Sequence, residues 1–399
     1  MSNHVLPPDT QAILLLCASF GQNRQLEPQP LTLSEYNCLA DWLRENQMRP
    51  ADLLETTAQK YLQNITINKL HPDRLSALLE RGAMLSLAVE KWTNMGLWVL
   101  GRSDTNYPKR LKQRLKHAAP PILYGIGNIE LLSMGGLAII GSRDVDEEIL
   151  SYTQRVTHNI VRQGIQVISG GARGVDQAAM LGILDAGGTS VGVLADSLIK
   201  AAVNSKYRSS IKEGRLTLIS SYDPHAGFNT GNAMGRNKYI YGLSDYALIV
   251  NSSFGKGGTW AGAVEALSRI KDVPVFVRIH PTVSEGNQEL YNQGAKPFPS
   301  EPWNDNLKEL LANSVNEPVP QATVAEILPQ ADIYEVVLPV ILNNLQQPKD
   351  AKSLAECLNV RLSQIQDWLN RAIREGKVRK MRKPVAYVVN QESTQLSFL

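Results

Sequence analysis

The stretch Val167–Met180 reads VISGGARGVDQAAM and joins an apolar segment to a segment of helical character. Three glycines surround the single arginine Arg173, and Asp176 follows shortly after the last of them. Glycines at a strand-to-helix corner let the backbone approach a ligand closely, and the start of a helix favours anions. The stretch therefore predicts a strand–turn–helix unit whose corner holds an anionic ligand.

Residues 135–280 repeat this alternation of strand and helix. The expected strands are LAIIG, IQVIS, TSVGVLA, LTLIS, YALIVN and PVFVRI. Short strands that are almost entirely apolar indicate a parallel sheet covered on both faces, and right-handed crossovers then give a doubly wound, Rossmann-like α/β domain. The expected helices cover 147–163, 175–186, 203–213, 236–243 and 259–270.

The remaining sequence predicts further domains on either side of this core. Residues 1–110 have the apolar periodicity and caps of a helical domain, and the Rossmann-like core follows at 111–285. Residues 286–330 are rich in Pro, Asn and Gln, which predicts a linker. Residues 331–399 predict three helices and two short strands, the pattern of a winged-helix domain.

A basic segment lies before the first core strand, in a region predicted to be helical. A charge run of this kind is typical of a solvated helix face. The second interpretation is an edge that contacts phosphates. The basic residues are Lys109, Arg110, Lys112, Arg114 and Lys116.

Ligands of doubly wound sheets bind beyond the carboxyl ends of the strands, so the residues that follow each strand are informative. Four such corners carry glycines, hydroxyl groups, arginines and lysines. Helix N-termini favour phosphates, and arginine binds phosphate oxygens in a bidentate manner. Neither GxGxxG nor a Walker pattern is present, so we expect a polyanion or nucleotide site without P-loop hydrolysis. The candidates are Gly141, Ser142, Arg143, Ser169, Gly170, Gly171, Arg173, Gly174, Asp176, Arg236, Asn237, Lys238, Lys256, Gly257, Gly258 and Thr259.

Several of these residues have a structural interpretation as well. Arg173 is suited to capping nearby carbonyl groups, and Asp176 to pairing with the helix dipole. In a binding role, Asp176 would orient Arg173 or hold a sugar hydroxyl. Aromatic side chains that could stack on bases or pack locally are Tyr222, Phe228, Tyr239 and Phe254.

Composition sets broad limits. The chain has 399 residues, a net charge of +3, 43% hydrophobic and 20% charged residues, so any basic surface must be local. Three widely spaced cysteines favour reduced thiols in the cytoplasm over disulfides, and no metal-ligand spacing or cofactor motif is seen. The first residues do not have the pattern of a signal peptide, and the apolar runs are too short to span a membrane.

The strings GSR, SGGARGVDQAA, GGTSVGVLA, GRNKYIYGLSDYALIV and GGTWAGAVEA, in this order, resemble the DprA/Smf family of DNA-processing proteins. The upstream segment DTNYPKRLK and the three-part layout fit the same family. The resemblance implies single-stranded DNA binding, loading of a RecA-type recombinase in natural transformation, a homodimer and no known catalytic chemistry. The residues it carries over as DNA contacts are Gly141, Ser142, Arg143, Ser169, Gly170, Arg173, Gly174, Arg236, Asn237 and Lys238.

The chain also departs from the family pattern. Met180 stands where the family usually has a histidine, and GKGGTWAGA replaces a serine-rich stretch. The glycine-rich loop after the fifth strand is similar to that of the wider superfamily of nucleotide-binding Rossmann proteins, which includes LOG-type phosphoribohydrolases. The alternative function is therefore a sensor or enzyme for a nucleotide derivative in defence or signalling, with Asp176 and Glu265 as the acids available to it.

The C-terminal segment RAIREGKVRKMRKP is strongly basic. A winged helix places its third helix in the major groove of duplex DNA and its wing near the backbone, whereas a solvated or protein-contacting module is the other interpretation. Trp368 and Leu369 are expected in its core. The possible duplex contacts are Arg371, Arg374, Arg379, Lys380, Arg382 and Lys383.

Overall fold

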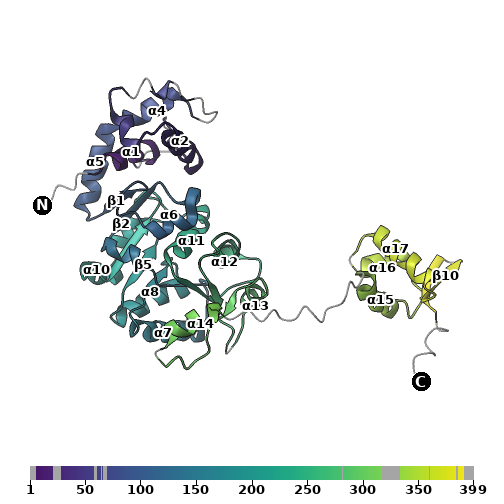
Figure 1. Ribbon diagram of the computed structural model, residues 1–399. Coiled ribbons are helices and arrows are strands. Elements are labelled where there is room, and N and C mark those ends of the chain that lie inside the picture. Colours follow the sequence, from purple (N-terminus) through teal and green to yellow (C-terminus); the bar gives the residue numbers. More distant parts are fainter. Residues whose placement is uncertain are drawn as a thin grey trace. The chain divides into compact units, whose positions relative to one another are not determined.

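The computed structural model of the chain describes residues 6–20, 28–57, 61–63, 65, 70–280, 282–304, 306–316, 333–358, 360–382 and 385–390. The chain forms two compact units, Met1–Val319 and Pro320–Leu399 (Figure 1). No helix among the described residues has the length and apolar character that a membrane span requires.

The first unit is built on one nine-stranded sheet in the order β1-β2-β6-β5-β4-β3-β7-β8-β9. All neighbouring pairs are parallel except those that β2 makes with β1 and β6, so β2 alone runs against the others. This confirms the doubly wound, mostly parallel sheet. The strands are β1 (Trp98–Gly101), β2 (Ile122–Ile126), β3 (Leu137–Gly141), β4 (Val167–Ser169), β5 (Ser190–Val193), β6 (Leu216–Ser220), β7 (Tyr246–Asn251), β8 (Val275–Val277) and β9 (Lys296–Pro297).

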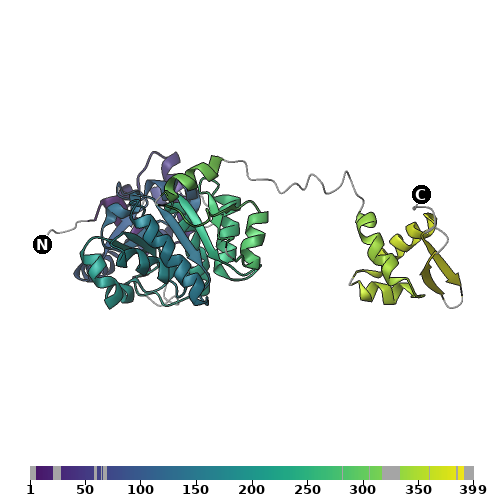
Figure 2. The same ribbon diagram turned by 90° about the horizontal axis from the view of Figure 1, so that it is seen from below.

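Helices cover both faces of the sheet (Figure 2). Alternate residues of β3 enter different cores: Leu137 and Ile139 pack on one side, and Ala138 and Ile140 on the other. The first face is covered by α7 (Glu147–Val161), α8 (Val175–Asp185), α9 (Leu198–Ala202), α10 (Ser205–Lys212) and α14 (Leu307–Asn316). The second is covered by α6 (Lys109–Leu115), α11 (Thr230–Leu243), α12 (Gly257–Arg269) and α13 (Glu285–Asn292). Short 3₁₀ turns are η2 (Lys116–Ala118) and η3 (Ile129–Ser133).

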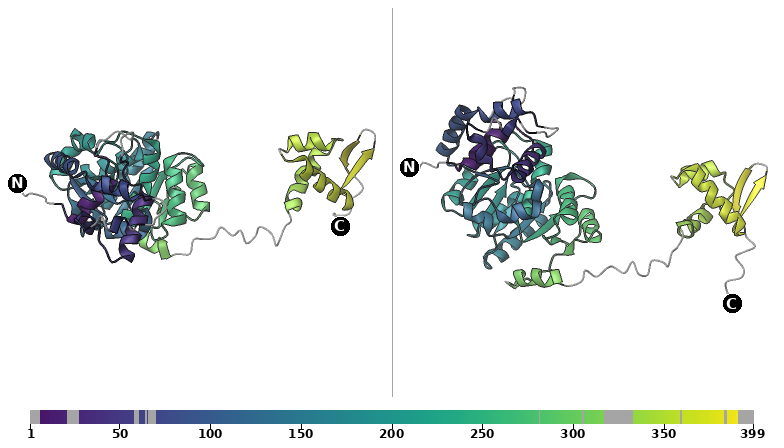
Figure 3. Two further views of the ribbon diagram at one scale, coloured as in Figure 1. Left: turned by 90° about the horizontal axis from the view of Figure 1, so that it is seen from above. Right: turned by 45° about the horizontal axis from the view of Figure 1, so that its top comes forward.

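The N-terminal helices pack over the β1–β2 end of the sheet (Figure 3), and their apolar residues belong to the first core. Leu14 of α1 and Leu39 of α2 belong to the same buried cluster as Tyr124 of β2. The predicted boundary after residue 110 therefore differs from the structure, because β1 already belongs to the sheet and the core is shared. These helices are α1 (Pro8–Cys17), α2 (Leu33–Glu45), η1 (Pro50–Leu54), α4 (Pro72–Leu79) and α5 (Gly82–Asn94).

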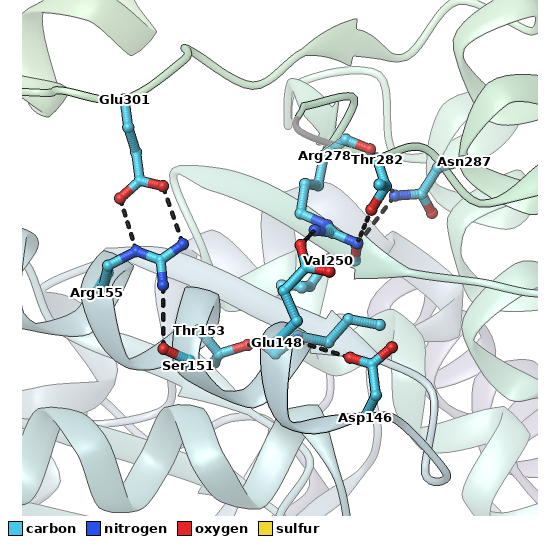
Figure 4. A network of polar contacts seen from close by, with 11 residues as sticks. Asp146, Glu148, Ser151, Thr153, Arg155, Val250, Arg278, Thr282, Asn287 and Glu301 are labelled. Atoms are coloured by element: carbon cyan, nitrogen blue, oxygen red, sulfur yellow. Dashed lines mark hydrogen bonds and ion pairs between the residues drawn. The ribbon is translucent and has the colours of Figure 1, made fainter.

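The predicted linker 286–330 also differs from the structure over its first part. Up to Asn316 the described residues form α13, β9 and α14, and they are held by specific contacts (Figure 4). Glu301 accepts two hydrogen bonds from the Arg155 guanidinium of α7, at 2.8 and 3.0 Å. Aromatic and aliphatic residues of this Pro-rich stretch, such as Trp303, are buried. Their presence in the sequence indicated a packed segment rather than a linker. The rest of the predicted linker, 317–330, lies outside the described residues.

The described residues of the second unit form three helices followed by an antiparallel pair of strands, as the sequence predicts. Leu369 is fully buried in its own core and Trp368 packs partly buried against it. The elements are α15 (Ile333–Asn344), α16 (Ala351–Cys357), α17 (Leu362–Arg374), β10 (Val378–Arg382) and β11 (Val385–Val389).

Candidate functional site

The chain order reverses between β3 and β7, which lie side by side although β4, β5 and β6 come between them in sequence. The β3–β7 register is irregular at Gly141, where the strands end. Such a switch point is where doubly wound sheets open a crevice for ligands. The crevice here is a cleft of about 620 Å³ beyond the carboxyl ends of the strands, and we call it the strand-end cleft. It is lined by Ile140, Gly141, Ser142, Arg143, Ala172, Asp176, Phe228, Thr230, Ala233, Met234, Arg236, Asn237, Ser253, Lys256, Gly257, Gly258 and Thr259.

A smaller hollow of about 290 Å³ adjoins this cleft over the ends of β4 and β5. The two share Arg143, Phe228 and Arg236 among their lining residues. Gly170, Gly171 and Arg173 of the central glycine-rich stretch line this hollow. Residues from all four predicted corners are therefore brought to one rim of the sheet.

Asp176 is buried at the floor of the cleft. Its carboxylate accepts hydrogen bonds from the backbone N–H groups of Gly141, at 3.3 Å, and Gly170, at 3.1 Å. Burial raises the pKa of Asp176 to about 6, although the nearby Arg236 guanidinium and the two amides oppose this rise. The two loop amides that the sequence suggested for a ligand are thus already bonded to a carboxylate of the protein itself.

Arg236 lies beside this carboxylate and is only 4% exposed. Its Nη1 donates to the Val193 carbonyl at 2.8 Å, while its Nε has no hydrogen-bond partner among the described residues. Burial lowers the pKa of Arg236, and Asp176 counteracts that effect. A Cβ at Gly170 would lie 1.6 Å from Arg236 Nη1 and 2.4 Å from Asp176 Oδ2, so only glycine leaves room for the pair.

The corner before α8 is closed by backbone contacts. Gly174 has φ of +87°, and a Cβ there would lie 2.4 Å from the Ser142 carbonyl oxygen. The same carbonyl accepts the N–H of Val175, the first residue of α8, at 3.3 Å. These contacts account for the third glycine of the stretch and occupy the first amide of α8.

Like α8, helix α12 has no side-chain cap at its N-terminus. Its first residues, Gly257 and Gly258, line the cleft. Asn237 Nδ2 donates to the Gly258 carbonyl at 2.8 Å, and Thr259 Oγ1 donates to the Gly141 carbonyl at 2.9 Å. These two side chains hold the start of α12 in place. The backbone N–H groups of its first turn point out of the end of the helix that faces the cleft.

The exposed cations of the rim come from three loops. The Arg143 guanidinium lies over the ring of Phe228, 5.1 Å from its centroid. Arg173 is 74% exposed and forms an ion pair with the exposed carboxylate of Asp144, a partner that the sequence analysis missed. Lys256 is exposed at the N-cap position of α12. The charge on this rim is therefore accessible, unlike that of Arg236.

The four aromatic candidates have different environments. Phe228 is 57% exposed and lines the cleft, and Phe254 is 48% exposed with its ring edge-on to Trp260. Tyr239 belongs to the second core, and the hydroxyl of Tyr222 donates to the Asn232 carbonyl at 3.0 Å. Only the two phenylalanines offer an exposed ring face or edge at the rim.

Three predicted site residues do not line the cleft or the hollow: Ser169, Gly174 and Lys238. The hydroxyl of Ser169 is fully buried and donates to the Ile139 carbonyl at 2.6 Å. Lys238 lies near the ring of Tyr239, 5.4 Å from its centroid. Glu265, the second acid considered for catalysis, is also outside the lining and lies 3.8 Å from Arg269.

Thr230, Ala233 and Met234 line the cleft and were missed by the sequence analysis. They belong to the first turns of α11, which begins at Thr230 rather than at the predicted residue 236. Gly231, Asn232 and Gly235 lower the helix propensity of this segment, so the sequence did not predict a helix there. The available sign was Asn229, whose side chain accepts the N–H of Asn232 as an N-cap.

The basic residues of the second unit are described separately. Arg371 and Lys377 both pair with Glu375, at 2.9 and 3.0 Å, and Arg371 also lies over the ring of Tyr334. Arg374, Arg379 and Lys380 are exposed. Arg382 ends β10, and Lys383 lies outside the described residues.

The chain is similar to a family of DNA-processing proteins. The sequence model of the family described as DNA recombination-mediator protein A matches residues 98–310, more than half of the chain. The chain is 25% identical over 251 residues to DNA processing protein DprA of Bacillus subtilis, covering 62% of this chain and 83% of the relative. It is 26% identical over 196 residues to DprA of Streptococcus pneumoniae, covering 48% and 68%. The X-ray structure of DNA processing protein A from Streptococcus pneumoniae matches with a TM-score of 0.57 at 20% identity, covers 76% of this chain and 98% of that chain, and shows a shared fold.

Proposed function

Because the chain belongs to the DNA recombination-mediator protein A family, we propose that it is a DNA-processing protein that binds single-stranded DNA in the strand-end cleft. Phosphates of the strand bind the first-turn amides of α12 and the side chains of Arg143 and Lys256. Bases stack against Phe228 and Phe254, the exposed rings of the rim. The strand is then passed to a RecA-type recombinase during transformation, with a homodimer as the acting form.

The observation that carries this proposal is the N-terminus of α12. It has no side-chain cap, it opens on the cleft, and exposed cations line the same cleft. The other amide-rich corners are less available, since Asp176 and the Ser142 carbonyl already accept their N–H groups. A helix N-terminus with nearby arginine and lysine has the chemistry that binds a backbone phosphate.

Asp176 bears on the alternative of a nucleotide-cleaving enzyme. A general acid or base must reach the reacting atoms, whereas this carboxylate is buried and holds two backbone amides together. Its position supports a structural role beneath the binding surface. We therefore assign the cleft to binding and propose no catalytic step there.

The test is the affinity of the full chain for a fluorescent oligothymidylate, measured by anisotropy at several salt concentrations. We expect Arg143→Ala and Lys256→Ala each to weaken binding several-fold, and each to reduce the slope of log affinity against log salt by about 0.7 because one phosphate contact is lost.

The matched control is Lys271→Ala, which removes an exposed lysine beyond the other end of α12. It should leave both the affinity and the salt slope unchanged. An Arg143→Ala/Lys256→Ala double variant that binds as tightly as the wild-type protein would rule out the proposed site.

A further inference from the structure

A second cavity, which we call the N-terminal groove, lies between α2, the residues that follow β1, and α6 with η2. Its volume is about 710 Å³, larger than that of the strand-end cleft. The proposed function does not use it. It is lined by Tyr36, Ala40, Asp41, Leu43, Arg44, Gln47, Met48, Pro50, Arg102, Ser103, Lys112, Lys116 and His117.

The lining of the N-terminal groove combines an apolar floor with a basic rim. Tyr36 and Leu43 are buried side chains beneath it. Asp41 is the one acid among the described lining residues, and Arg44 pairs with it at 2.9 Å. The remaining charged or titratable residues of the lining are Arg102, Lys112, Lys116 and His117. Several cations around one groove suit a ligand with an anionic backbone.

The basic helix α6 divides its charges between two sides. Arg110 donates to the Asp245 carboxylate at 2.5 Å, and Arg114 donates to the Gly242 carbonyl at 3.2 Å, so both fix the C-terminal end of α11. Lys112 and Lys116 are exposed and line the N-terminal groove instead, and Lys112 Nζ also donates to the Arg102 carbonyl at 3.3 Å. The basic residues of α6 and Lys116 are therefore neither a uniformly solvated helix face nor a set of purely structural contacts.

The groove is pre-shaped in two respects. The Arg102 guanidinium donates to Asn37 Oδ1 at 2.7 Å and lies 4.9 Å from the centroid of the Tyr36 ring, so its position is fixed. Gln47 and Lys116 have φ of +58° and +50°, and they are two of the four non-glycine residues with positive φ in the described part of the chain. Backbone strain of this kind concentrates at functional sites.

The N-terminal groove and the strand-end cleft lie at the same edge of the sheet. Arg102 follows the carboxyl end of β1, and β1 runs in the same direction as β3 because β2 is antiparallel to both β1 and β6. The two strands are five positions apart in the sheet, or about 24 Å at the usual strand spacing. A single strand of several nucleotides spans that distance.

We propose that the N-terminal groove is a second binding site for the same single strand, so that DNA held in the strand-end cleft continues across the sheet edge to Arg102, Lys112 and Lys116. The inference rests on the proposed function of the strand-end cleft. An acidic segment of a partner protein is the competing occupant, and the shared edge favours DNA.

The test compares two oligothymidylates, of about 4 and about 20 nucleotides, on the full chain. At a rise of about 3.4 Å per nucleotide along one strand, only the longer one reaches between two sites about 24 Å apart. The double variant Lys112→Gln/Lys116→Gln should weaken binding of the long strand about fivefold or more and reduce its salt slope by about 1.4. Binding of the short strand should be unchanged. The control Lys109→Gln/Lys206→Gln removes two exposed lysines outside both cavities and should match the wild-type protein on both strands.

Unchanged affinity of the double variant for the long strand overturns the proposal, as does an equal loss in the control. Binding of a fluorescent poly-glutamate peptide is measured on the same proteins. If the double variant Lys112→Gln/Lys116→Gln binds this peptide less well than the wild-type protein but keeps its affinity for the long strand, the groove binds an acidic protein segment instead. A wild-type protein that does not bind the short strand, or an Arg143→Ala variant that binds it normally, contradicts the proposed function of the strand-end cleft rather than the second site.

Discussion

Asp176 occupies a position inside the protein that resembles that of a bound anion. Two backbone amides from different strand ends point at its carboxylate, and a buried guanidinium lies next to it. The two hydrogen bonds tie the ends of β3 and β4 to the first turn of α8, and Arg236 of α11 lies beside them below the cleft. The opposite charges of Asp176 and Arg236 balance each other at the floor of the cleft. Binding of an anionic ligand therefore depends on the exposed cations above them.

The raised pKa of Asp176 predicts a specific dependence of stability on pH. The folded protein binds this proton more tightly than the unfolded chain does, since the folded pKa is about 6 and that of an unperturbed aspartate is about 3.9. The contribution of Asp176 to stability is therefore complete below about pH 4 and is lost as the pH rises through about 6. Relative to Asp176→Asn, the wild-type protein should lose on the order of 2–3 kcal/mol of unfolding free energy over this range.

Urea unfolding of both proteins at intervals between about pH 4 and pH 7.5 measures this difference. The asparagine variant supplies the control, because it has the same size and no titration at this position. Two curves that stay parallel across the range would show that Asp176 has an ordinary pKa in the folded protein.

At the scale of elements, the ends of β7 and β8 are held by α13. Asn287 is fully buried, and its Nδ2 contacts the carbonyls of Ile249, Val250 and Arg278 at 3.0–3.2 Å. Its Oδ1 accepts from Ser252 Oγ at 2.8 Å. Figure 4 shows Arg278 beside this contact, between Asn287 and Glu148. The loop that leads to α12 therefore starts from a fixed point.

Replacing Asn287 with alanine should destabilise the first unit by about 3 kcal/mol, because several buried carbonyls lose their donor at once. Asn292→Ala, at the exposed end of the same helix, should change stability by less than about 0.5 kcal/mol. The measurement is the midpoint of thermal or urea unfolding of each variant. Similar midpoints for the two variants would show that α13 does not depend on this contact.

The sequence predicts elements well where burial on both sides leaves a clear pattern. LAIIG, LTLIS and YALIVN are β3, β6 and β7 to the residue. It fails where a contact joins distant segments: Asp176 and Arg236 are 60 positions apart, and nothing in either segment shows that they meet. The candidate rim was therefore predictable, but the division between exposed cations and buried supports was not.

At the scale of the whole molecule, the two units have separate hydrophobic cores. The N-terminal helices share a core with the sheet, whereas Tyr334, Leu345 and Leu369 belong to a core of the second unit alone. The sequence missed the first fact because amphipathic helices look alike whether they pack on each other or on a sheet. Separate cores predict that the two units act independently on DNA.

The final prediction concerns duplex binding by the second unit. Arg374, Arg379 and Lys380 are exposed on α17 and β10, whereas Arg371 is engaged with Glu375. In the full chain, the triple variant Arg374→Gln/Arg379→Gln/Lys380→Gln should weaken binding of a short duplex about tenfold and lower its salt slope by about 2.7, at 0.9 for each phosphate contact. Affinity for the short oligothymidylate should not change, because the proposed site for that strand lies in the first unit. The triple variant Lys206→Gln/Lys271→Gln/Lys352→Gln removes the same charge elsewhere. If it weakens duplex binding equally, the effect is one of net charge, and the second unit has no duplex site on this face.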